Sequence, residues 1–286
     1  MLNPLHGLPP FDYIKPGSLK EASVYLSSNH PHAAPFSGGT DIFVKLRGLF
    51  SQYKFLVDIK HLPGMSEIQF DEVDGLLIGA AVDMNRVIHS PVINHFYPVL
   101  TNACANVASY QLRTRATIIG NICNASPAGD TIGACLLLDG MLNTYHHAGG
   151  RQIPLADFFS GPGETILIPG EIVTSIQIPA PPAGMTGTYI KLGRNAKGDL
   201  AIVGVTVVGY PDESIASGYQ IKLALASVYP TPLVVNQVND LLSTTPICEE
   251  RIQECGEISM NASNPVDDVR ASARYRKYMV RNLTIK

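Results

Sequence analysis

The 286-residue chain has few cysteines, and no two of them are spaced to hold a metal cluster. The five cysteines are an odd number, and no Cys-x-x-Cys pair occurs. A disulfide framework, a zinc ribbon or a ferredoxin-type iron–sulfur cluster would need such a set of thiols. The sequence therefore argues against all three and favours buried structural thiols. The cysteines concerned are Cys104, Cys123, Cys135, Cys248 and Cys255.

A basic excess and a long apolar run are also missing. The formal net charge is −3, which argues against a nucleic-acid-binding protein. No apolar run approaches the roughly 18–20 residues that a membrane helix needs. The N-terminus has no basic region followed by an apolar core, so we expect no secretory signal and a cytoplasmic protein. The length and the 45% hydrophobic fraction fit a folded protein of two or three parts.

Two common phosphate-binding motifs do not occur. The chain has neither a Walker A sequence nor the Gly-x-Gly-x-x-Gly turn of a Rossmann fold. A nucleotide site in this chain must therefore belong to a different fold.

The spacing of apolar residues predicts an α+β protein in three parts. In residues 1–60, Ser18 and Glu21 form a capping box for a helix that runs to about Ser28. Strands are expected over 32–37 and 55–59, with a helix over 41–47 between them. Strand–helix–strand spacing this tight favours parallel pairing.

Residues 61–178 form the second expected part. Asp83 can cap one helix, while Pro91 and Pro98 suit the first turns of two more. A further helix follows Asp130. The expected elements are strands over 76–81, 142–146, 166–168 and 172–178 and a helix over 131–139.

Residues 179–286 form the third part, because Pro179–Gly184 has the composition of a boundary. Three strands that follow one another suggest an antiparallel meander. Thr231-Pro232 is expected to start a helix, with Thr231 as its cap. The strands are expected over 188–192, 200–208 and 221–228, and two later helices near 248–257 and 267–280.

Two glycine-containing stretches could bind a diphosphate. Pro35–Asp41 joins a strand to a helix N-terminus, where backbone amides and the helix dipole favour anions. Thr117–Asp130 is expected to be a long small-and-polar loop, with Thr117 and Asn121 as phosphate donors and Asp130 as an acceptor for ribityl or ribose hydroxyls. Neither stretch alone is specific, and Gly-Gly-Thr-Asp between a strand and a helix is commonly just a tight turn.

With these residues, the chain resembles the FAD-binding medium subunit of molybdenum hydroxylases, the group that includes carbon monoxide dehydrogenase and xanthine dehydrogenase. The resemblance covers nearly the whole chain, and the ordered set of motifs is far more specific than any one of them. The matching segments are Phe11–Pro16, Ser37–Asp41, Gln111–Arg113, Asn124–Asp130, Pro169–Ile172, Lys191–Arg194, Asp199–Val205 and Ala273–Arg276. It implies a fold of the vanillyl-alcohol-oxidase (PCMH) type, with FAD between the first two parts and a separate C-terminal domain.

The resemblance also implies which residues bind FAD. Asp130 matches an acid that contacts FAD, Val107 and Val173 match apolar positions near it, and Lys191 matches a lysine near the flavin ring. A cation there would favour negative charge on the reduced flavin. The pyrophosphate loops correspond to Pro35, Phe36, Ser37, Gly38, Gly39, Thr40, Asp41 and Ile42, and to Thr117, Ile118, Gly120 and Asn121. No catalytic residue is expected.

One position departs from the family pattern, because Ile119 replaces the first glycine of the second loop. A β-branched residue tolerates positive φ poorly. Either φ is negative at Ile119 or the loop is reshaped in a way that would weaken FAD binding.

The family's division of labour sets the expected partners. A large subunit carries the molybdenum cofactor and a small one carries two [2Fe–2S] clusters, in a dimer of heterotrimers. This chain would pass electrons through FAD to an external acceptor. Two alternatives stay open: a free-standing FAD-dependent oxidoreductase with its own substrate site, and an FAD-free scaffold protein. The His146-His147 pair is not expected to share a metal ion, because adjacent strand residues point to opposite faces, and both histidines are expected at the surface.

Overall fold

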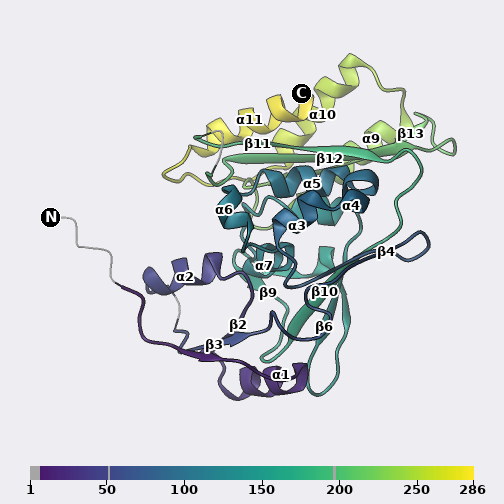
Figure 1. Ribbon diagram of the computed structural model, residues 1–286. Helices are drawn as coiled ribbons and strands as arrows, with labels where there is room; N and C mark the ends of the chain where they lie inside the picture. The colour runs from purple at the N-terminus through teal and green to yellow at the C-terminus, as the bar shows by residue number, and fades with distance from the viewer. Residues whose placement is uncertain (1–6, 51, 196–197) are drawn as a thin grey trace.

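Three main sheets follow one another along the chain, each with helices packed on it (Figure 1). The computed structural model describes residues 7–50, 52–195 and 198–286. Residues 1–6, part of the N-terminal segment considered for a secretory signal, lie outside the described residues. No helix in the described part of the chain is both long and apolar enough to cross a membrane.

The first sheet is small and parallel, as predicted, with strand order β1-β3-β2. Ser18 caps α1 by accepting a hydrogen bond from the Glu21 amide at 3.1 Å, while the Glu21 carboxylate accepts from the Gly17 amide at 2.7 Å. The capping box therefore forms, with its return bond one residue earlier than usual. The elements are β1 (Asp12–Ile14), α1 (Leu19–Ser28), β2 (Ala33–Phe36), α2 (Thr40–Arg47) and β3 (Phe55–Asp58). Strand β1 was not predicted.

The second sheet is antiparallel and has the order β4-β5-β10-β6-β7. Its central strand β10 is buried over most of its length, and its four apolar residues and Ser175 are the buried ones. The strands are β4 (Ile68–Asp71), β5 (Gly75–Gly79), β6 (Met141–Tyr145), β7 (Gln152–Pro154) and β10 (Ile172–Ile178). The strand predicted over 166–168 is wrong; the nearest pairing is a short hairpin, β8 (Phe159–Gly161) with β9 (Glu164–Thr165), after the 3₁₀ turn η1 (Leu155–Asp157).

Six helices lie between β5 and β6 in the sequence. The predicted Asp83 cap and the predicted first-turn positions of Pro91 and Pro98 are confirmed, and the Ser90 side chain caps a further helix. The helices are α3 (Met84–His89), α4 (Pro91–Phe96), α5 (Pro98–Ala105), α6 (Tyr110–Arg113), α7 (Ile118–Asn124) and α8 (Ile132–Leu137). The predicted long loop over 117–130 is therefore wrong in its first half, because α7 occupies it.

The third sheet is the predicted antiparallel meander, extended by a fourth strand to β11-β12-β13-β14. The helix predicted to begin at Thr231-Pro232 is wrong. Residues there lead into strand β14, which pairs with β13, and the next helix starts at Asn236. The elements are β11 (Thr186–Leu192), β12 (Val203–Pro211), β13 (Tyr219–Ala226), β14 (Leu233–Val234), α9 (Asn236–Thr244), α10 (Glu249–Ala262) and α11 (Ala273–Ile285).

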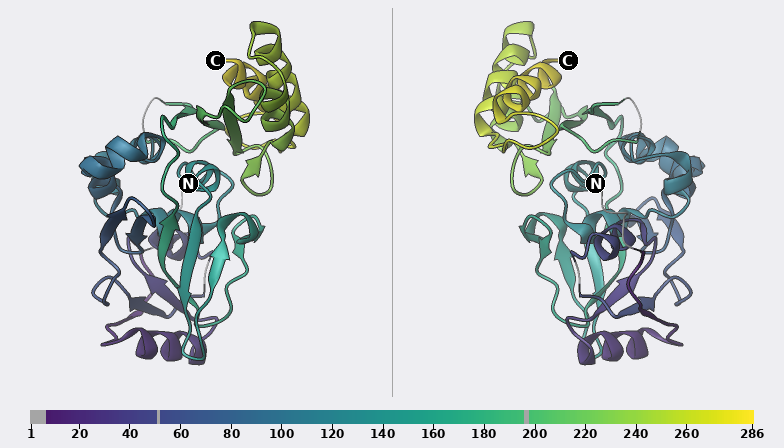
Figure 2. Two further views of the ribbon diagram at one scale, coloured as in Figure 1. Left: turned by 90° about the vertical axis from the view of Figure 1, so that its right-hand side faces the viewer. Right: turned by 90° about the vertical axis from the view of Figure 1, so that its left-hand side faces the viewer.

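Both faces of this third sheet are covered (Figures 1 and 2). Helices α5 and α8 pack on one face, and α9, α10 and α11 lie on the other. One hydrophobic core runs from β5 and β10 through α5 and α8 to Tyr189, Val208 and Ala224 of the sheet. Each fully buried Val, Leu, Ile, Phe or Met side chain of this core stabilises the fold by about 1.5–3 kcal/mol.

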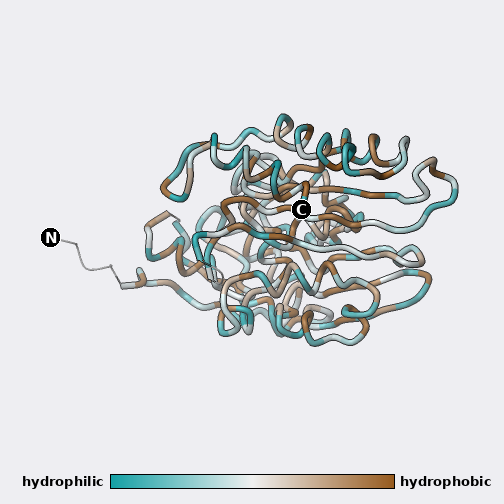
Figure 3. Tube along the Cα trace, turned by 90° about the horizontal axis from the view of Figure 1, so that it is seen from above, coloured by the Kyte–Doolittle hydropathy of each residue, from teal (hydrophilic) through white to brown (hydrophobic). Residues whose placement is uncertain are grey.

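Many elements carry both hydrophobic and hydrophilic residues. Hydrophobic and hydrophilic residues alternate along much of the trace when the molecule is seen from above (Figure 3). This alternation is expected when an element buries one face.

Candidate functional site

A cavity of about 670 Å³ lies between residues of all three parts of the chain. Its wall comes mainly from 34–45 in the first part and from 107–130 and 171–173 in the second, with 198–200 from the third. The volume is within the range of about 300–1,000 Å³ that small-molecule sites occupy.

Most of the residues predicted to bind the cofactor line this cavity. Ile118 does not, because its side chain is fully buried in the core, and neither does Lys191. The predicted residues that line it are Pro35, Phe36, Ser37, Gly38, Gly39, Thr40, Asp41, Ile42, Val107, Thr117, Gly120, Asn121, Asp130 and Val173.

The first loop leads from β2 into the N-terminus of α2 at the cavity wall. Gly39 has a φ of +76° and is the N-cap of α2, where no side chain caps the helix. A Cβ at this position would lie 2.5 Å from the Phe36 ring, so a glycine is required. The first helical turn, Thr40 to Ile42, has amides without intrahelical acceptors. These amides, facing a cavity with no capping side chain, suit an anion.

The two loops touch each other. A Cβ on Gly38 would lie 2.2 Å from the carbonyl oxygen of Arg115 and 2.9 Å from its carbonyl carbon. On the same side, Ser37 Oγ donates to the Ala80 carbonyl at 3.1 Å, and the Met84 amide donates to the Ala116 carbonyl at 2.9 Å. The turn after β2 is therefore held directly against the residues that precede Thr117.

The second stretch is a capped helix start. Thr117 Oγ1 accepts a hydrogen bond from the Gly120 amide at 2.9 Å, so its hydroxyl hydrogen stays available as a donor. Asn121 Oδ1 accepts from both the amide and the hydroxyl of Thr131. The Asn121 carbonyl is therefore occupied, and its NH₂ group is the part that could act as a donor.

Of the two alternatives considered for Ile119, a negative φ or a reshaped loop, the structure has the first. Ile119 lies in α7 and is not among the described residues with positive φ. Its side chain is buried and forms part of the cavity wall. The replacement of glycine therefore costs no backbone strain, and its effect is to add a side chain to the wall.

Asp130 sits on the cavity wall within a buried polar network. Its two oxygens accept hydrogen bonds from Tyr189 Oη at 2.5 Å and from Lys191 Nζ at 2.8 Å. Burial raises the pKa of Asp130, and the Lys191 charge and the two hydrogen bonds oppose that rise. The Lys191 side chain is 9% exposed, so it is not a solvated strand lysine; it is an ion-pair partner of Asp130.

Sequence reasoning missed several wall residues. Leu167, Glu171 and Ile172 line the cavity beside Val173, and Asp199 and Leu200 line it from the loop between β11 and β12. All of these residues except Leu167 fall in segments whose motifs matched the family. The sequence signal that could have found Leu200 is an apolar residue next to Gly198-Asp199. Leu200 is 57% exposed, so it is an apolar residue that the core does not bury.

Three of the four acids that line the cavity are held in ion pairs. Glu171 binds Arg151 Nε at 2.8 Å, and hydrogen bonds led by those from Arg151 outweigh burial and lower the Glu171 pKa. Asp199 binds Arg194 Nε at 3.1 Å. With Asp130 held by Lys191 as well, the wall is better suited to binding than to acid–base chemistry.

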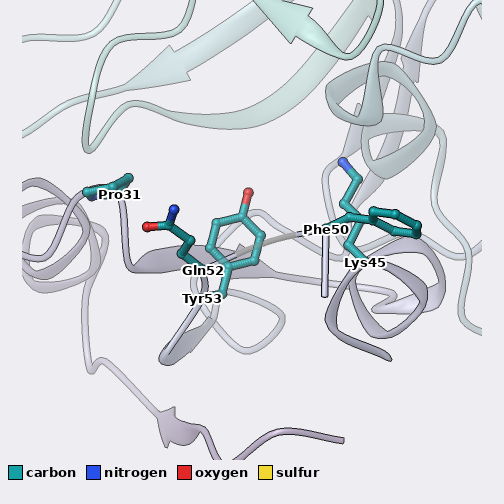
Figure 4. Close-up of a pocket in the computed structure, with 5 residues that line it drawn as sticks. All are labelled: Pro31, Lys45, Phe50, Gln52 and Tyr53. Carbon is teal, nitrogen blue, oxygen red and sulfur yellow. The ribbon is translucent and has the colours of Figure 1, made fainter. Parts of the chain in front are cut away.

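A second, smaller hollow of about 330 Å³ opens next to the cavity. Figure 4 shows Pro31, Gln52 and Tyr53 on one side of it and Lys45 and Phe50 on the other. Lys45 and Tyr53 line both hollows. Phe50 is 81% exposed, so this hollow is largely an open surface.

The His146-His147 pair lies at the surface, as expected, with His147 exposed and His146 partly exposed, but the two residues are not in a strand. Strand β6 ends at Tyr145, and the two rings lie 4.1 Å apart, so the argument from opposite strand faces was wrong. His147 is tied to α1, since its amide donates to Ser23 Oγ at 2.9 Å. Among the described residues, no three His, Cys, Asp or Glu side chains are grouped to hold a metal ion.

The donor set fits a dinucleotide such as FAD. Uncapped amides, two close-packed glycines and short hydroxyl and amide side chains suit a pyrophosphate. The apolar wall at Val107, Ile172 and Val173 suits a flat ring.

Comparisons with known proteins agree over the whole chain. The family model described as the FAD binding domain in molybdopterin dehydrogenase matches residues 9–181, and that of the CO dehydrogenase flavoprotein C-terminal domain matches 188–286. A putative xanthine dehydrogenase FAD-binding subunit of Escherichia coli is 26% identical over 96% of this chain and 93% of its own.

Carbon monoxide dehydrogenase of Hydrogenophaga pseudoflava is similar in both sequence and structure. Its medium chain is 29% identical over 95% of this chain and 93% of its own. A solved structure of that enzyme, in a form that lacks the Mo-pyranopterin moiety of the molybdenum cofactor, aligns with a TM-score of 0.92 and 28% identity, covering 98% of this chain and 96% of the other. The α+β arrangement expected from the sequence, an FAD-binding fold followed by a C-terminal domain, is therefore confirmed.

Proposed function

We propose a function from one premise: this chain belongs to the molybdopterin dehydrogenase family of FAD-binding subunits, and is therefore an FAD-carrying component of an oxidoreductase. We infer that it accepts electrons from [2Fe–2S] clusters on a partner chain and passes them to an external acceptor. The family and its cofactor are established by the matches; the direction of electron flow is our proposal.

One observation carries the proposal most directly. The backbone at Gly38 lies against Arg115, so the uncapped start of α2 and the capped start of α7 face one cavity. Two separate segments can then bind one diphosphate, which neither could hold alone.

We assign the binding roles as follows. The amides of Thr40 to Ile42, with the Thr117 hydroxyl and the Asn121 amide group, would hold the pyrophosphate. Asp130 would accept a hydrogen bond from a ribityl or ribose hydroxyl, and the apolar wall would receive the ring. When bound, FAD supplies the capacity to exchange electrons singly or in pairs. This chain contributes binding, orientation and exclusion of water.

We also propose the assembly. The related enzymes have chains named medium chain or FAD-binding subunit. By analogy, a large subunit with the molybdenum cofactor and a small one with two [2Fe–2S] clusters would accompany this chain, as a dimer of heterotrimers in the cytoplasm. Within the chain, residues 1–60 and 61–178 would enclose FAD, and 179–286 would form the third domain.

The proposal is tested on the purified full-length chain. We expect a flavin absorption spectrum, or its appearance after addition of FAD, with one FAD per chain. A folded chain that binds no FAD would leave only the scaffold alternative.

Mixing the FAD-loaded chain with organic donors tests the other alternative, a free-standing FAD-dependent oxidoreductase with its own substrate site. We expect no useful rate of flavin reduction without the partner subunits, because three of the four acids of the wall, Asp130, Glu171 and Asp199, are held in ion pairs. Rapid reduction by an organic donor would instead show a free-standing oxidoreductase.

A further inference from the structure

A buried network connects the C-terminal sheet to the wall of the cavity. Tyr189 and Lys191 are two residues apart on β11, so their side chains leave the same face of the strand. Their polar atoms contact different oxygens of Asp130, at 2.5 Å from Tyr189 Oη and 2.8 Å from Lys191 Nζ. Asp130 lines the cavity, and Tyr189 and Lys191 lie behind it.

The position of Tyr189 is tightly constrained. Tyr189 is 3% exposed, and its backbone amide donates to Asn102 Oδ1 on α5 at 2.7 Å. A Cβ at Gly204 on β12 would lie 2.7 Å from Tyr189 Oη, so the ring needs a glycine there. The phenol therefore reaches Asp130 in one fixed orientation.

Lys191 is fixed in the same way. Its Nζ donates to the Asn106 carbonyl at 3.0 Å as well as to Asp130. The ion pair with Asp130 neutralises the Lys191 charge, and the Lys191 side chain does not line the cavity. Lys191 is thus placed to act on Asp130, whereas the resemblance implied direct action on the flavin ring.

We propose that Tyr189 is a positioning residue for the cofactor, which with Lys191 keeps Asp130 ionised and oriented as a hydroxyl acceptor on the cavity wall. This inference rests on the proposed function, since it concerns how the same site holds FAD. A buried carboxylate without these donors would take up a proton more readily and would be a weaker acceptor.

The surrounding groups support this role. Burial and the Asp130 charge raise the pKa of Tyr189 well above its ordinary value, so the phenol remains a donor. On α5, the Cys104 thiol also faces the Asp130 charge; burial raises its pKa, and it stays neutral. Lys191 is therefore the cation that balances Asp130 within this network.

The test compares Tyr189→Phe with Tyr97→Phe in the full-length chain. Tyr97 is a matched control, because it is fully buried and its hydroxyl donates to the Pro179 carbonyl at 2.9 Å without lining the cavity. FAD is titrated into the FAD-free proteins between about pH 5 and pH 8, and the dissociation constant is read from flavin fluorescence. Melting temperatures report folding.

We expect Tyr189→Phe to bind FAD about 5- to 10-fold more weakly at neutral pH, the factor for one lost hydrogen bond. We also expect the acid-side loss of affinity to begin at a higher pH than in wild type, since Asp130 loses a donor to its charged form. Tyr97→Phe should leave both the affinity and the pH profile unchanged.

Lys191→Met provides a second variant if Tyr189→Phe does not fold, and it should displace the pH profile in the same direction. If a folded Tyr189→Phe or Lys191→Met variant binds FAD with the wild-type affinity and pH profile, the inference about Tyr189 is wrong. The proposed function would still stand in that case. Failure of wild type to bind FAD would overturn the proposed function and this inference with it.

Discussion

The contact between the two loops makes Gly38→Ala a sharp test of the site. The added methyl group would lie 2.2 Å from the Arg115 carbonyl oxygen and 3.2 Å from the Ala116 Cα. Both neighbours are backbone atoms, so no flexible side chain can move aside. Restoring an ordinary contact requires the two backbones to separate by about 1 Å.

This separation is large relative to a hydrogen bond. Moving the first turn of α2 by about 1 Å from the start of α7 should break at least one charge-assisted bond to the diphosphate, worth about 1.5–3 kcal/mol. Because about 1.4 kcal/mol is a tenfold change in affinity, we expect Gly38→Ala to bind FAD about 10- to 100-fold more weakly.

The assay is a fluorescence titration of FAD into the FAD-free, full-length chain, with the melting temperature measured in parallel. Gly17→Ala is the control, since its added Cβ would meet Glu21 Oε2 at an ordinary 3.5 Å and it lies outside the cavity wall. A folded Gly38→Ala protein with wild-type affinity would show that the contact between the loops does not organise the diphosphate site.

Three further predictions concern Ile119, Gly133 and Asp58. Ile119→Gly removes a side chain from the cavity wall, so FAD content should be unchanged or higher by absorbance, while the melting temperature of the FAD-free chain falls; a clear loss of FAD would contradict our interpretation of α7. Gly133→Ala would place a Cβ 2.6 Å from Thr206 Oγ1, and urea unfolding should show a loss of about 1–3 kcal/mol; unchanged stability would mean that α8 is not closely packed on β12. Burial opposes ionisation of Asp58, but hydrogen bonds led by Lys60 outweigh it and lower its pKa. The resulting stability is present above the ordinary Asp pKa of about 4 and is lost as the pH falls through the lower folded value. Asp58→Asn should therefore be less stable at pH 7 and less sensitive to acid below about pH 4 in urea titrations; a parent-like acid slope would refute this.

Local signals were sufficient for most helices and for the buried strands. The Ser18 cap, the Asp83 cap and the prolines at 91 and 98 act within one helical turn, so a short stretch of sequence reveals them. Strand β10 has enough apolar residues to be recognised without knowing its neighbours.

The strands that were missed lie at sheet edges. Strands β1, β4, β7 and β14 are all edge strands of two to four residues, and backbone pairing to one neighbour defines them. Their sequences carry little periodicity, because an edge strand buries few side chains. The same reason explains the error at Thr231-Pro232, where a helix-start signal was overruled by pairing with β13.

The sequence by itself determined which residues are predicted to bind the cofactor, because glycine, short polar side chains and helix starts are local requirements for holding an anion. Only the tertiary structure decided how those residues act together. It brought Gly38 against Arg115, made Ile119 part of a helix and a wall, and turned Lys191 toward Asp130. These outcomes depend on packing between segments dozens of residues apart, and no local pattern encodes such distances.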